Sequence, residues 1–240
     1  MSGEHKIVPK QDWVKFRKEL LIKEKELKKL SDEVSQARRD MPWVEITKNY
    51  IFHGPEGDVS FDDLFKGKKQ LIVQHFMYGS NWTEGCPRCS AIADCHNGIN
   101  IHLNQRDINM VVISNGHLEN LLNYKNRMGW TFDWYSCLGS DFGYDFDVSF
   151  TKEAYDNGTA TYNYAPLKNP VDELSGVSVF IKGDDGKIYH TYSAFFDSLE
   201  PLLTFYRYMD ITPIGRNEDP DKIFMSWVKR HDEYEVSDRK

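Results

Sequence analysis

Two cysteines three positions apart, Cys86 and Cys89, are the side chains of this chain best suited to chemistry. They follow an apolar run, Leu71–Met77, that predicts a buried strand, and they open a segment, Cys86–Gln105, that predicts a helix. At a helix N-terminus the unpaired amides and the helix dipole favour thiolate over thiol at the first sulfur, and Arg88 adds a nearby cation. The pattern predicts that the Cys86 thiolate attacks a disulfide or peroxide and that Cys89 then resolves the product.

The same cysteine spacing is also half of a zinc site. Against zinc, the chain has no second C-x-x-C and no H-x-x-x-H sequence. A third interpretation is an inert pair that is retained for packing. We favour the redox interpretation and predict no bound metal. The residues that a zinc site would have to recruit are Cys95, His96, His102 or Cys137, of which the two cysteines are expected to be small buried hydrophobes.

The segments that must position the two cysteines predict an α/β fold. Asn109–Ser114 predicts a second buried strand and His117–Met128 a second helix, which together imply a parallel β-α-β unit with a right-handed crossover. Two later extended runs flank a Gly-Asp-Asp-Gly turn, and a final helix is expected at Ser198–Met209. We therefore predict a central mixed sheet flanked by helices. The remaining expected strands are Val44–Phe52 and Val59–Phe65 in an entry hairpin, and Val177–Lys182 and Lys187–Tyr192 in the later one.

The first forty residues predict a separate element. They carry 11 basic and 8 acidic side chains, against 19 and 29 in the remainder. From Asp12, an expected N-cap, apolar residues recur at near-helical spacing, which predicts one long amphipathic helix that ends before Pro42. We expect its apolar stripe to pack on the domain or on a second subunit; a membrane surface or nucleic acid is less favoured, because the polar face mixes both signs. The stripe consists of Trp13, Phe16, Leu20, Leu27, Leu30 and Val34.

The predicted organisation has three parts: a helical extension at 1–41, a domain at 42–215 and a tail at 216–240 with a short helix around Ile223–Val228. Within the domain, a stretch at about 130–172 is rich in aromatic, Gly and Asp residues and is too long for an ordinary connection. We expect a structural insertion, with a binding surface as the alternative. One group of aromatic residues could either pack in the core or line a pocket above Cys86, and core packing is favoured. The group comprises Trp82, Trp130, Trp134, Tyr135, Phe142 and Tyr144.

Composition and missing motifs exclude several functional classes. The chain has 240 residues and a formal charge of −7, so one globular domain with additions is expected and nucleic acid is an improbable main partner. No apolar run of about 18 residues and no secretory signal is visible, which predicts a cytoplasmic protein without a membrane partner. Phosphate-cradling Gly-rich loops, the G-x-S-x-G elbow and the H-E-x-x-H helix are missing, so no bound cofactor and no common hydrolase plan is implied.

The order strand, C-x-x-C, helix, strand, helix, hairpin and helix resembles the thioredoxin-like fold, with the long helix and the aromatic insertion added. More narrowly, nearly the whole chain resembles the bacterial family catalogued as domain of unknown function 899. The activity of that family is not established, so the resemblance implies the fold more strongly than the function. It rests on W-T-E-G-C-P-R-C at 82–89, R-M-G-W at 127–130, S-D-F-x-x-D-F at 140–146, H-T-Y-S at 190–193, L-x-x-Y at 203–206 and D-I-T-P-I-G-R at 210–216.

The sequence at 83–86 is also similar to the T-x-x-C of peroxiredoxins. That resemblance implies that the Thr83 hydroxyl helps to orient a peroxide and that a distant arginine stabilises the thiolate. Arg127 is the candidate for this arginine. One position differs, because the proline that precedes the threonine by four residues in peroxiredoxins is Gly79 here.

A second difference concerns the cis-proline that thioredoxins place before the strand facing the dithiol. The corresponding residue here is Gly176 or Val177. Because the cis-proline shapes the groove for a substrate backbone, its absence disfavours general protein-disulfide reduction more than thiol-peroxide chemistry. His75, just upstream of the cysteine loop, and His190 in the H-T-Y-S motif are expected to be hydrogen-bonded structural residues.

Two hypotheses follow. The first is a thiol oxidoreductase of thioredoxin-like fold in which Cys86 attacks, Cys89 resolves, and Thr83, Arg88 and Arg127 support the thiolate. Its partners would be a small peroxide or disulfide substrate and an external thiol reductant. The second is a non-catalytic binding or scaffold protein, whose aromatic segment holds a small apolar ligand or whose N-terminal helix pairs two subunits into a homodimer.

Overall fold

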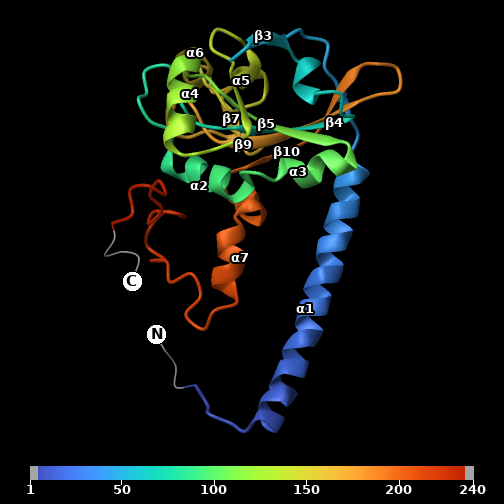
Figure 1. Ribbon diagram of the computed structural model, residues 1–240, viewed down its shortest axis with the longest axis vertical. Coiled ribbons are helices and arrows are strands. Elements are labelled where there is room, and N and C mark those ends of the chain that lie inside the picture. Colours follow the sequence, from blue (N-terminus) through green and yellow to red (C-terminus); the bar gives the residue numbers. More distant parts are fainter. Residues whose placement is uncertain (1–4, 236–240) are drawn as a thin grey trace. The chain divides into compact units, whose positions relative to one another are not determined.

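The computed structural model describes residues 5–235 (Figure 1). The chain divides into two compact units, Met1–Pro42 and Trp43–Lys240. The first unit contains one long helix, and the second contains the strands and the remaining helices. Within the described residues, no helix is both long enough and apolar enough to span a membrane.

The long helix of the first unit, α1 (Lys10–Arg39), begins two residues before the expected N-cap. Pro9, in an extended conformation, is its N-cap. Asp12 therefore lies in the first turn, where its carboxylate stabilises the positive end of the helix dipole. Its last turn carries Arg38 and Arg39, whose positive charges stabilise the negative C-terminal end of the helix dipole. The helix ends before Pro42, as predicted.

An eight-stranded mixed sheet forms the centre of the second unit, in the order β1-β10-β9-β4-β5-β6-β2-β3. Strand β4 pairs in parallel with β5, and β5 with β6, whereas the other neighbours pair antiparallel. A separate ribbon joins β7 to β8. The strands are β1 (Val44–Glu45), β2 (Ile51–Gly54), β3 (Gly57–Ser60), β4 (Gln70–His75), β5 (Ile108–Ser114), β6 (Asp133–Ser136), β7 (Thr161–Tyr162), β8 (Ala165–Pro166), β9 (Gly176–Lys182) and β10 (Ile188–Phe195).

Helices cover one face of this sheet, and an aromatic layer covers the other. Residues of α2, α4 and α7 pack with side chains from the same face of β4, β5, β6, β9 and β10. Figure 1 shows α2 and α7 on one side of the sheet and α5 on the opposite side. The helices are α2 (Pro87–His96), α3 (Asn100–Leu103), α4 (Leu118–Arg127), α5 (Phe142–Asp145), α6 (Lys152–Asp156) and α7 (Thr204–Asp210), with 3-10 turns at Asp63–Phe65, Asn104–Arg106 and Phe196–Leu202.

The aromatic layer is centred on Phe142, which is fully buried. Its ring centroid lies 4.9 Å from that of Phe52 and 4.8 Å from that of Phe146, so rings from β2 and from the α5 segment meet there. Edge-to-face geometry dominates, as expected from the quadrupole of an aromatic ring. Other buried members of this layer are Tyr50, Phe61, Phe65 and Phe180.

The fold is thioredoxin-like, which confirms the predicted class. Strands and helices follow the order β4, α2, β5, α4 and then β9, β10, α7, with β5, β4, β9 and β10 as neighbours in the sheet. Three strands were not expected: β6, β7 and β8 lie inside the stretch at 130–172, and β6 pairs in parallel with β5. That stretch is therefore partly a sheet element and not only an insertion.

Several element boundaries differ from the predictions. The helix expected at Cys86–Gln105 ends at His96, because Asn97 leaves the helical conformation and Gly98 adopts a φ of +85° that disfavours other residues. The strand expected at Val59–Phe65 stops at Ser60, whose backbone N–H donates to the Asp63 carboxylate at 2.8 Å and so starts a 3-10 turn.

The C-terminal predictions were also partly wrong. The helix expected at Ser198–Met209 is a 3-10 helix that contains Pro201, followed by α7. Proline has no N–H to donate and disfavours a continuous α-helix at that point. The short helix expected around Ile223–Val228 consists of turns.

Removing the Phe142 ring tests the aromatic layer. We expect Phe142→Ala to lower the free energy of unfolding by about 3–5 kcal/mol, because the cavity left behind is bordered by several rings. Urea unfolding followed by circular dichroism measures the change. Tyr144→Ala is the matched control on the same short helix; its side chain is exposed, so the change should stay within about 0.5 kcal/mol. Equal losses in the two variants would contradict the proposed centre of the layer.

Candidate active site

The backbone of Met77, two residues beyond β4, holds both cysteines. The N–H of Cys86 donates to the Met77 carbonyl at 3.1 Å, and the N–H of Met77 donates to the Cys89 sulfur at 3.5 Å. Cys86 is the N-cap of α2, and Pro87 follows at the first helical position, where the missing N–H has no intrahelical partner to lose. The structure thus places the first sulfur at the helix N-terminus and the second one turn further along the helix.

The two thiols have very different proton affinities. The pKa of Cys86 is lowered to about 6, chiefly because the Cys89 side chain donates a hydrogen bond to its sulfur. Partial burial opposes this shift, whereas the backbone N–H groups of Cys89 and Arg88 and the charge of Arg88 reinforce it. The same contact raises the pKa of Cys89 well above its ordinary value. At neutral pH the pair is therefore a Cys86 thiolate beside a protonated Cys89.

Cys89 is buried, with 1% of its surface exposed, whereas Cys86 is only partly buried. The first turn of α2 is fixed around them by side-chain hydrogen bonds. The Ser90 hydroxyl donates to the Cys86 carbonyl at 2.9 Å and lies 2.9 Å from the Tyr124 hydroxyl, while Gln74 donates to the Cys89 carbonyl at 3.2 Å. Of the two cysteines, only Cys86 is partly exposed, so its sulfur is the one that a substrate could reach.

Gly85 allows the loop to enter the helix closely against the core. A Cβ atom at this position would lie 2.6 Å from the Phe76 ring and 2.7 Å from the Tyr124 ring. Its carbonyl accepts hydrogen bonds from Arg230 Nε at 3.0 Å and Nη2 at 2.9 Å. Arg230 also pairs with Glu84 at 3.2 Å. Arg230, in the C-terminal tail, therefore binds the cysteine loop at two adjacent residues. No motif in the sequence indicated this contact.

Arg127 and Thr83, two predicted site residues, occupy the rim of the loop. Arg127 pairs with Glu84 and with Asp232, the latter at 2.7 Å. Its guanidinium also lies 5.5 Å from the centre of the Tyr124 ring. The structure therefore joins Arg127 to the loop through Glu84, and its charge is not among the causes of the Cys86 pKa shift. Thr83 is exposed, and its hydroxyl makes no hydrogen bond within residues 5–235.

A buried carboxyl group, Glu173, lies within electrostatic reach of the dithiol. It is 8% exposed, and its Oε1 atom has no hydrogen-bond partner among residues 5–235. Burial raises its pKa to about 7, with interactions from Asn115 and the backbone of Tyr78 opposing the shift. Its charge contributes to the raised pKa values of both Cys89 and Cys137. No motif or spacing in the sequence indicated that Glu173 lies near the dithiol, because it belongs to a loop before β9.

A pocket of about 210 Å³ opens beside the cysteine loop. Of the aromatic group considered in the sequence, Trp82 and Tyr144 line this pocket, whereas its other members are buried in the two cores. The Glu173 carboxyl also borders it. The remaining lining residues are Gly79, Ser80, Asn81, Asn115, Phe150 and Asp172. The pocket is thus partly aromatic with an acidic wall, and the aromatic stretch contributes both to core packing and to this surface.

His75 and His190 are joined through two serines within the sheet. His75 Nε2 lies 2.8 Å from the Ser178 hydroxyl, which lies 2.8 Å from the Ser193 hydroxyl, which lies 2.8 Å from His190 Nε2. Burial lowers the pKa of His75 to about 3 and also lowers that of His190. Both are hydrogen-bonded structural histidines, as predicted.

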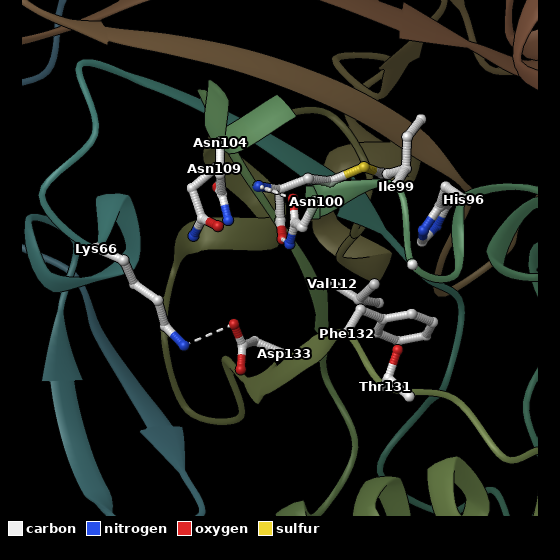
Figure 2. Close-up of a pocket in the computed structure, with 12 residues that line it drawn as sticks. Lys66, His96, Ile99, Asn100, Asn104, Asn109, Val112, Thr131, Phe132 and Asp133 are labelled. Carbon is white, nitrogen blue, oxygen red and sulfur yellow. Dashed lines mark hydrogen bonds and ion pairs between the residues drawn. The ribbon is translucent and has the colours of Figure 1, made fainter. Parts of the chain in front are cut away.

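A second pocket, of about 250 Å³, is lined by none of the predicted catalytic residues (Figure 2). Figure 2 shows Lys66 and Asp133 pointing toward one another, and their charged groups are 2.7 Å apart. Asn100 and Asn109 on the neighbouring wall already donate to backbone carbonyls. Its polar groups are thus largely paired within the protein.

The zinc ligands considered in the sequence do not gather around the dithiol. Within residues 5–235, no three His, Cys, Asp or Glu side chains are placed to hold a metal ion. Cys95 is partly buried, and burial raises the pKa of Cys137 to about 12. The cysteine loop thus brings two thiols together, with a buried carboxyl group within electrostatic reach of them.

The family model described as a bacterial protein of unknown function (DUF899) matches residues 2–234. The chain belongs to this family. The match confirms the resemblance that was drawn from the cysteine motif and the five other motifs. A comparison with functionally curated proteins finds no match for this DUF899 chain.

Solved structures similar to this DUF899 chain include two bacterial peroxiredoxins. A mutant of peroxiredoxin Q from Xanthomonas campestris is 11% identical, with a TM-score of 0.45 over 70% of this chain and 99% of that one. Peroxidoxin BcpB from Mycobacterium tuberculosis is 10% identical, with a TM-score of 0.46 over 70% and 97%. A thiol:disulfide interchange protein DsbE from Chlorobium tepidum is 12% identical, with a TM-score of 0.36 over 69% and 98%. At these values the chemistry has to be argued from the site itself.

Replacing Cys89 tests the origin of the Cys86 pKa. In the native chain, alkylation of Cys86 by iodoacetamide should rise with pH through about 6 and then level off, because the thiolate is the reactive form. In Cys89→Ala the main stabilising hydrogen bond is lost, so the midpoint should move up toward the ordinary thiol value of about 8.5. Peptide mapping after pH-jump alkylation measures it. Cys95→Ala should leave the midpoint in place; an unmoved midpoint in Cys89→Ala would contradict the assignment.

Proposed function

We propose that this protein is a thiol-dependent oxidoreductase that cycles Cys86 and Cys89 between a dithiol and a disulfide. The observation that carries the proposal is the contact between an accessible thiolate and a buried, protonated second thiol at the start of α2. A nucleophile with a pKa just below neutral pH is ionised while its sulfur remains nucleophilic. The second thiol lies within reach of the first, so the covalent intermediate can be resolved inside the same chain.

With a peroxide, the Cys86 thiolate attacks one oxygen, the O–O bond breaks, and the alkoxide or hydroxide leaves with a proton from solvent. The Cys89 sulfur then loses its proton and attacks the sulfur of the Cys86 sulfenic acid; the S–O bond breaks, and the oxygen takes up a proton from solvent and departs as water. With a disulfide, Cys86 forms a mixed disulfide and releases one thiolate, and Cys89 releases the other. An external thiol reductant supplies the two electrons that restore the dithiol in either case.

Glu173 is the proposed acceptor for the Cys89 proton. Resolution requires Cys89 to lose this proton, and the loss is unfavourable beside a Cys86 thiolate. Once Cys86 has reacted, its negative charge is gone and the pKa of Cys89 falls. A carboxyl group with a pKa of about 7 is then well matched to take the proton near neutral pH.

The other predicted residues have supporting roles in this proposal. Arg88 stabilises the thiolate by its charge and its backbone N–H. Thr83 presents its hydroxyl on the exposed rim, where it would orient a bound peroxide. Arg127 and Arg230 position the loop through Glu84 and Gly85. Because the pocket beside the loop has an acidic wall, a small uncharged substrate suits it better than an anionic one.

The pocket also supports the second function considered in the sequence, which is binding of a small apolar ligand without catalysis. Its 210 Å³ and its aromatic side chains are compatible with such a ligand. The two functions differ in the behaviour of Cys86. In a pure binding protein, replacing Cys86 would leave ligand affinity unchanged and there would be no thiol turnover to lose.

A peroxide pulse on the native chain tests the redox cycle. Mild hydrogen peroxide or cumene hydroperoxide should remove two of the four thiols and lower the intact mass by two hydrogens; a small aromatic disulfide tests the second substrate class. Cys86→Ser should abolish turnover with every substrate, whereas Cys89→Ser should stop after one addition at Cys86. Cys95→Ser is the matched control and should turn over normally. If Cys86→Ser turns over at the native rate, the proposed function is wrong.

The role of Glu173 is tested by the rate of resolution. In single-turnover stopped-flow, disulfide formation in the native chain should speed up as pH rises through about 7, because Glu173 accepts a proton only when ionised. In Glu173→Gln this inflection should disappear, and the rate at neutral pH should fall roughly a hundredfold. Asp172→Asn changes a neighbouring exposed carboxylate and should keep an inflection, moved to slightly lower pH because the charge of Asp172 contributes to the raised pKa of Glu173. An unchanged profile in Glu173→Gln would remove Glu173 from the mechanism.

A further inference from the structure

Helix α1 carries a row of exposed apolar side chains at a seven-residue repeat. Trp13, Leu20, Leu27 and Val34 are each seven positions apart, and Phe16, Leu30 and Ala37 fall between them at the alternate positions of the same repeat. Trp13 is 55% exposed and Leu27 is 68% exposed. A repeat of 3.5 residues over four heptads is the pattern by which two helices wind around one another. An isolated surface helix has no reason to keep this spacing.

We propose that α1 pairs with α1 of a second copy of this chain in a parallel, in-register two-stranded coiled coil. The helix has 30 residues, which corresponds to about 45 Å of seam. The proposal does not depend on the dithiol chemistry, because none of the residues involved belongs to the candidate active site.

Charges beside the seam select a parallel pair. One flank is a row of acids at Asp12, Glu19, Glu26 and Glu33, and the opposite flank holds Arg17, Glu24, Ser31 and Arg38. In a parallel coiled coil each residue of the first row faces the partner residue five positions further along. Asp12 then faces Arg17 of the partner subunit, and Glu33 faces Arg38 of the partner subunit. In an antiparallel pair the acidic row would face itself, so repulsion disfavours that orientation.

Lys23 is the single charged residue at a seam position of α1. In the in-register pair Lys23 meets Lys23 of the partner subunit, and the like-charged flanking pair, Glu19 with Glu24 of the partner subunit, lies directly beside these two lysines and offers them carboxylates. The long lysine stem can cover the seam while its ammonium group reaches these carboxylates. A charge at this position also fixes the register, since a shift by one heptad would place each lysine against Phe16 or Leu30 of the partner subunit.

Alternative occupants of the apolar row fit these charges less well. An anionic bilayer would meet the acidic row next to the apolar side chains, which is unfavourable. Docking on the domain of the same chain requires no seven-residue repeat and no reciprocal charges. These alternatives predict a monomer in solution, so they are distinguished from the coiled coil by mass alone.

Sedimentation equilibrium of the full chain in excess reductant tests the pairing. The native chain should be a dimer. Leu27→Asp should weaken dimerisation at least about a hundredfold, because each of the two helices would then carry a carboxylate in the apolar seam. Ile22→Asp is the matched control, because Ile22 is similarly exposed at 60% but lies away from the seam, and it should remain dimeric. Circular dichroism checks that both variants keep their helix content. A monomeric native chain, or equal effects of the two variants, would overturn the proposal.

A charge reversal tests the orientation. Glu33→Lys should weaken a parallel dimer roughly fivefold, because the introduced ammonium group would face Arg38 of the partner subunit in both halves. In an antiparallel dimer the same change would face the acidic row and strengthen it. Asp32→Lys makes the same charge change on the outer side of the helix and should leave the dimer affinity within about twofold. Tighter dimerisation of Glu33→Lys would overturn the parallel arrangement.

Discussion

The positions of both sulfur atoms depend on the backbone of Met77. Its carbonyl accepts a hydrogen bond from the Cys86 N–H, and its own N–H donates a hydrogen bond to the Cys89 sulfur. The backbone of one residue therefore sets the distance and orientation of the two cysteines. Met77 is placed by β4, a central strand with β5 on one side and β9 on the other. A displacement of β4 would have to disturb the middle of the sheet. The geometry of the dithiol is therefore as rigid as the core itself.

The electrostatics of the site separate three titrating groups that share a small volume. The pKa of Cys86 is lowered to about 6, and the pKa of Cys89 is raised well above its ordinary value. The pKa of Glu173 is raised to about 7. Before reaction, one negative charge resides on the accessible sulfur and is stabilised by the proton of the buried one. In the proposed cycle that charge moves to the substrate on reaction, and Glu173 takes up the proton that Cys89 releases. Burial of the second thiol and of the carboxyl group is what makes this sequence of proton positions favourable.

Local patterns of the sequence predicted the cysteine site, because a strand, a C-x-x-C and a helix follow one another within about thirty residues. Contacts between distant segments could not be predicted in this way. Gly85 and Arg230 are 145 positions apart, and an arginine in an irregular tail has no periodicity that points to a partner. Glu173 likewise enters from a loop. Strand β6 was missed because its four residues lie inside an aromatic stretch whose alternation is too short to distinguish from core packing.

The two faces of the sheet differ in their response to pH, and this difference bears on the chemistry. On the aromatic face, burial lowers the pKa of His75 to about 3, so this imidazole is neutral near pH 7, and burial also lowers the pKa of His190. Their hydrogen bonds through Ser178 and Ser193 connect β4, β9 and β10 without introducing a charge. The pKa of about 7 near the dithiol therefore belongs to Glu173 and not to His75. The strands that lead to Met77 are joined by a hydrogen-bonded network of two histidines and two serines.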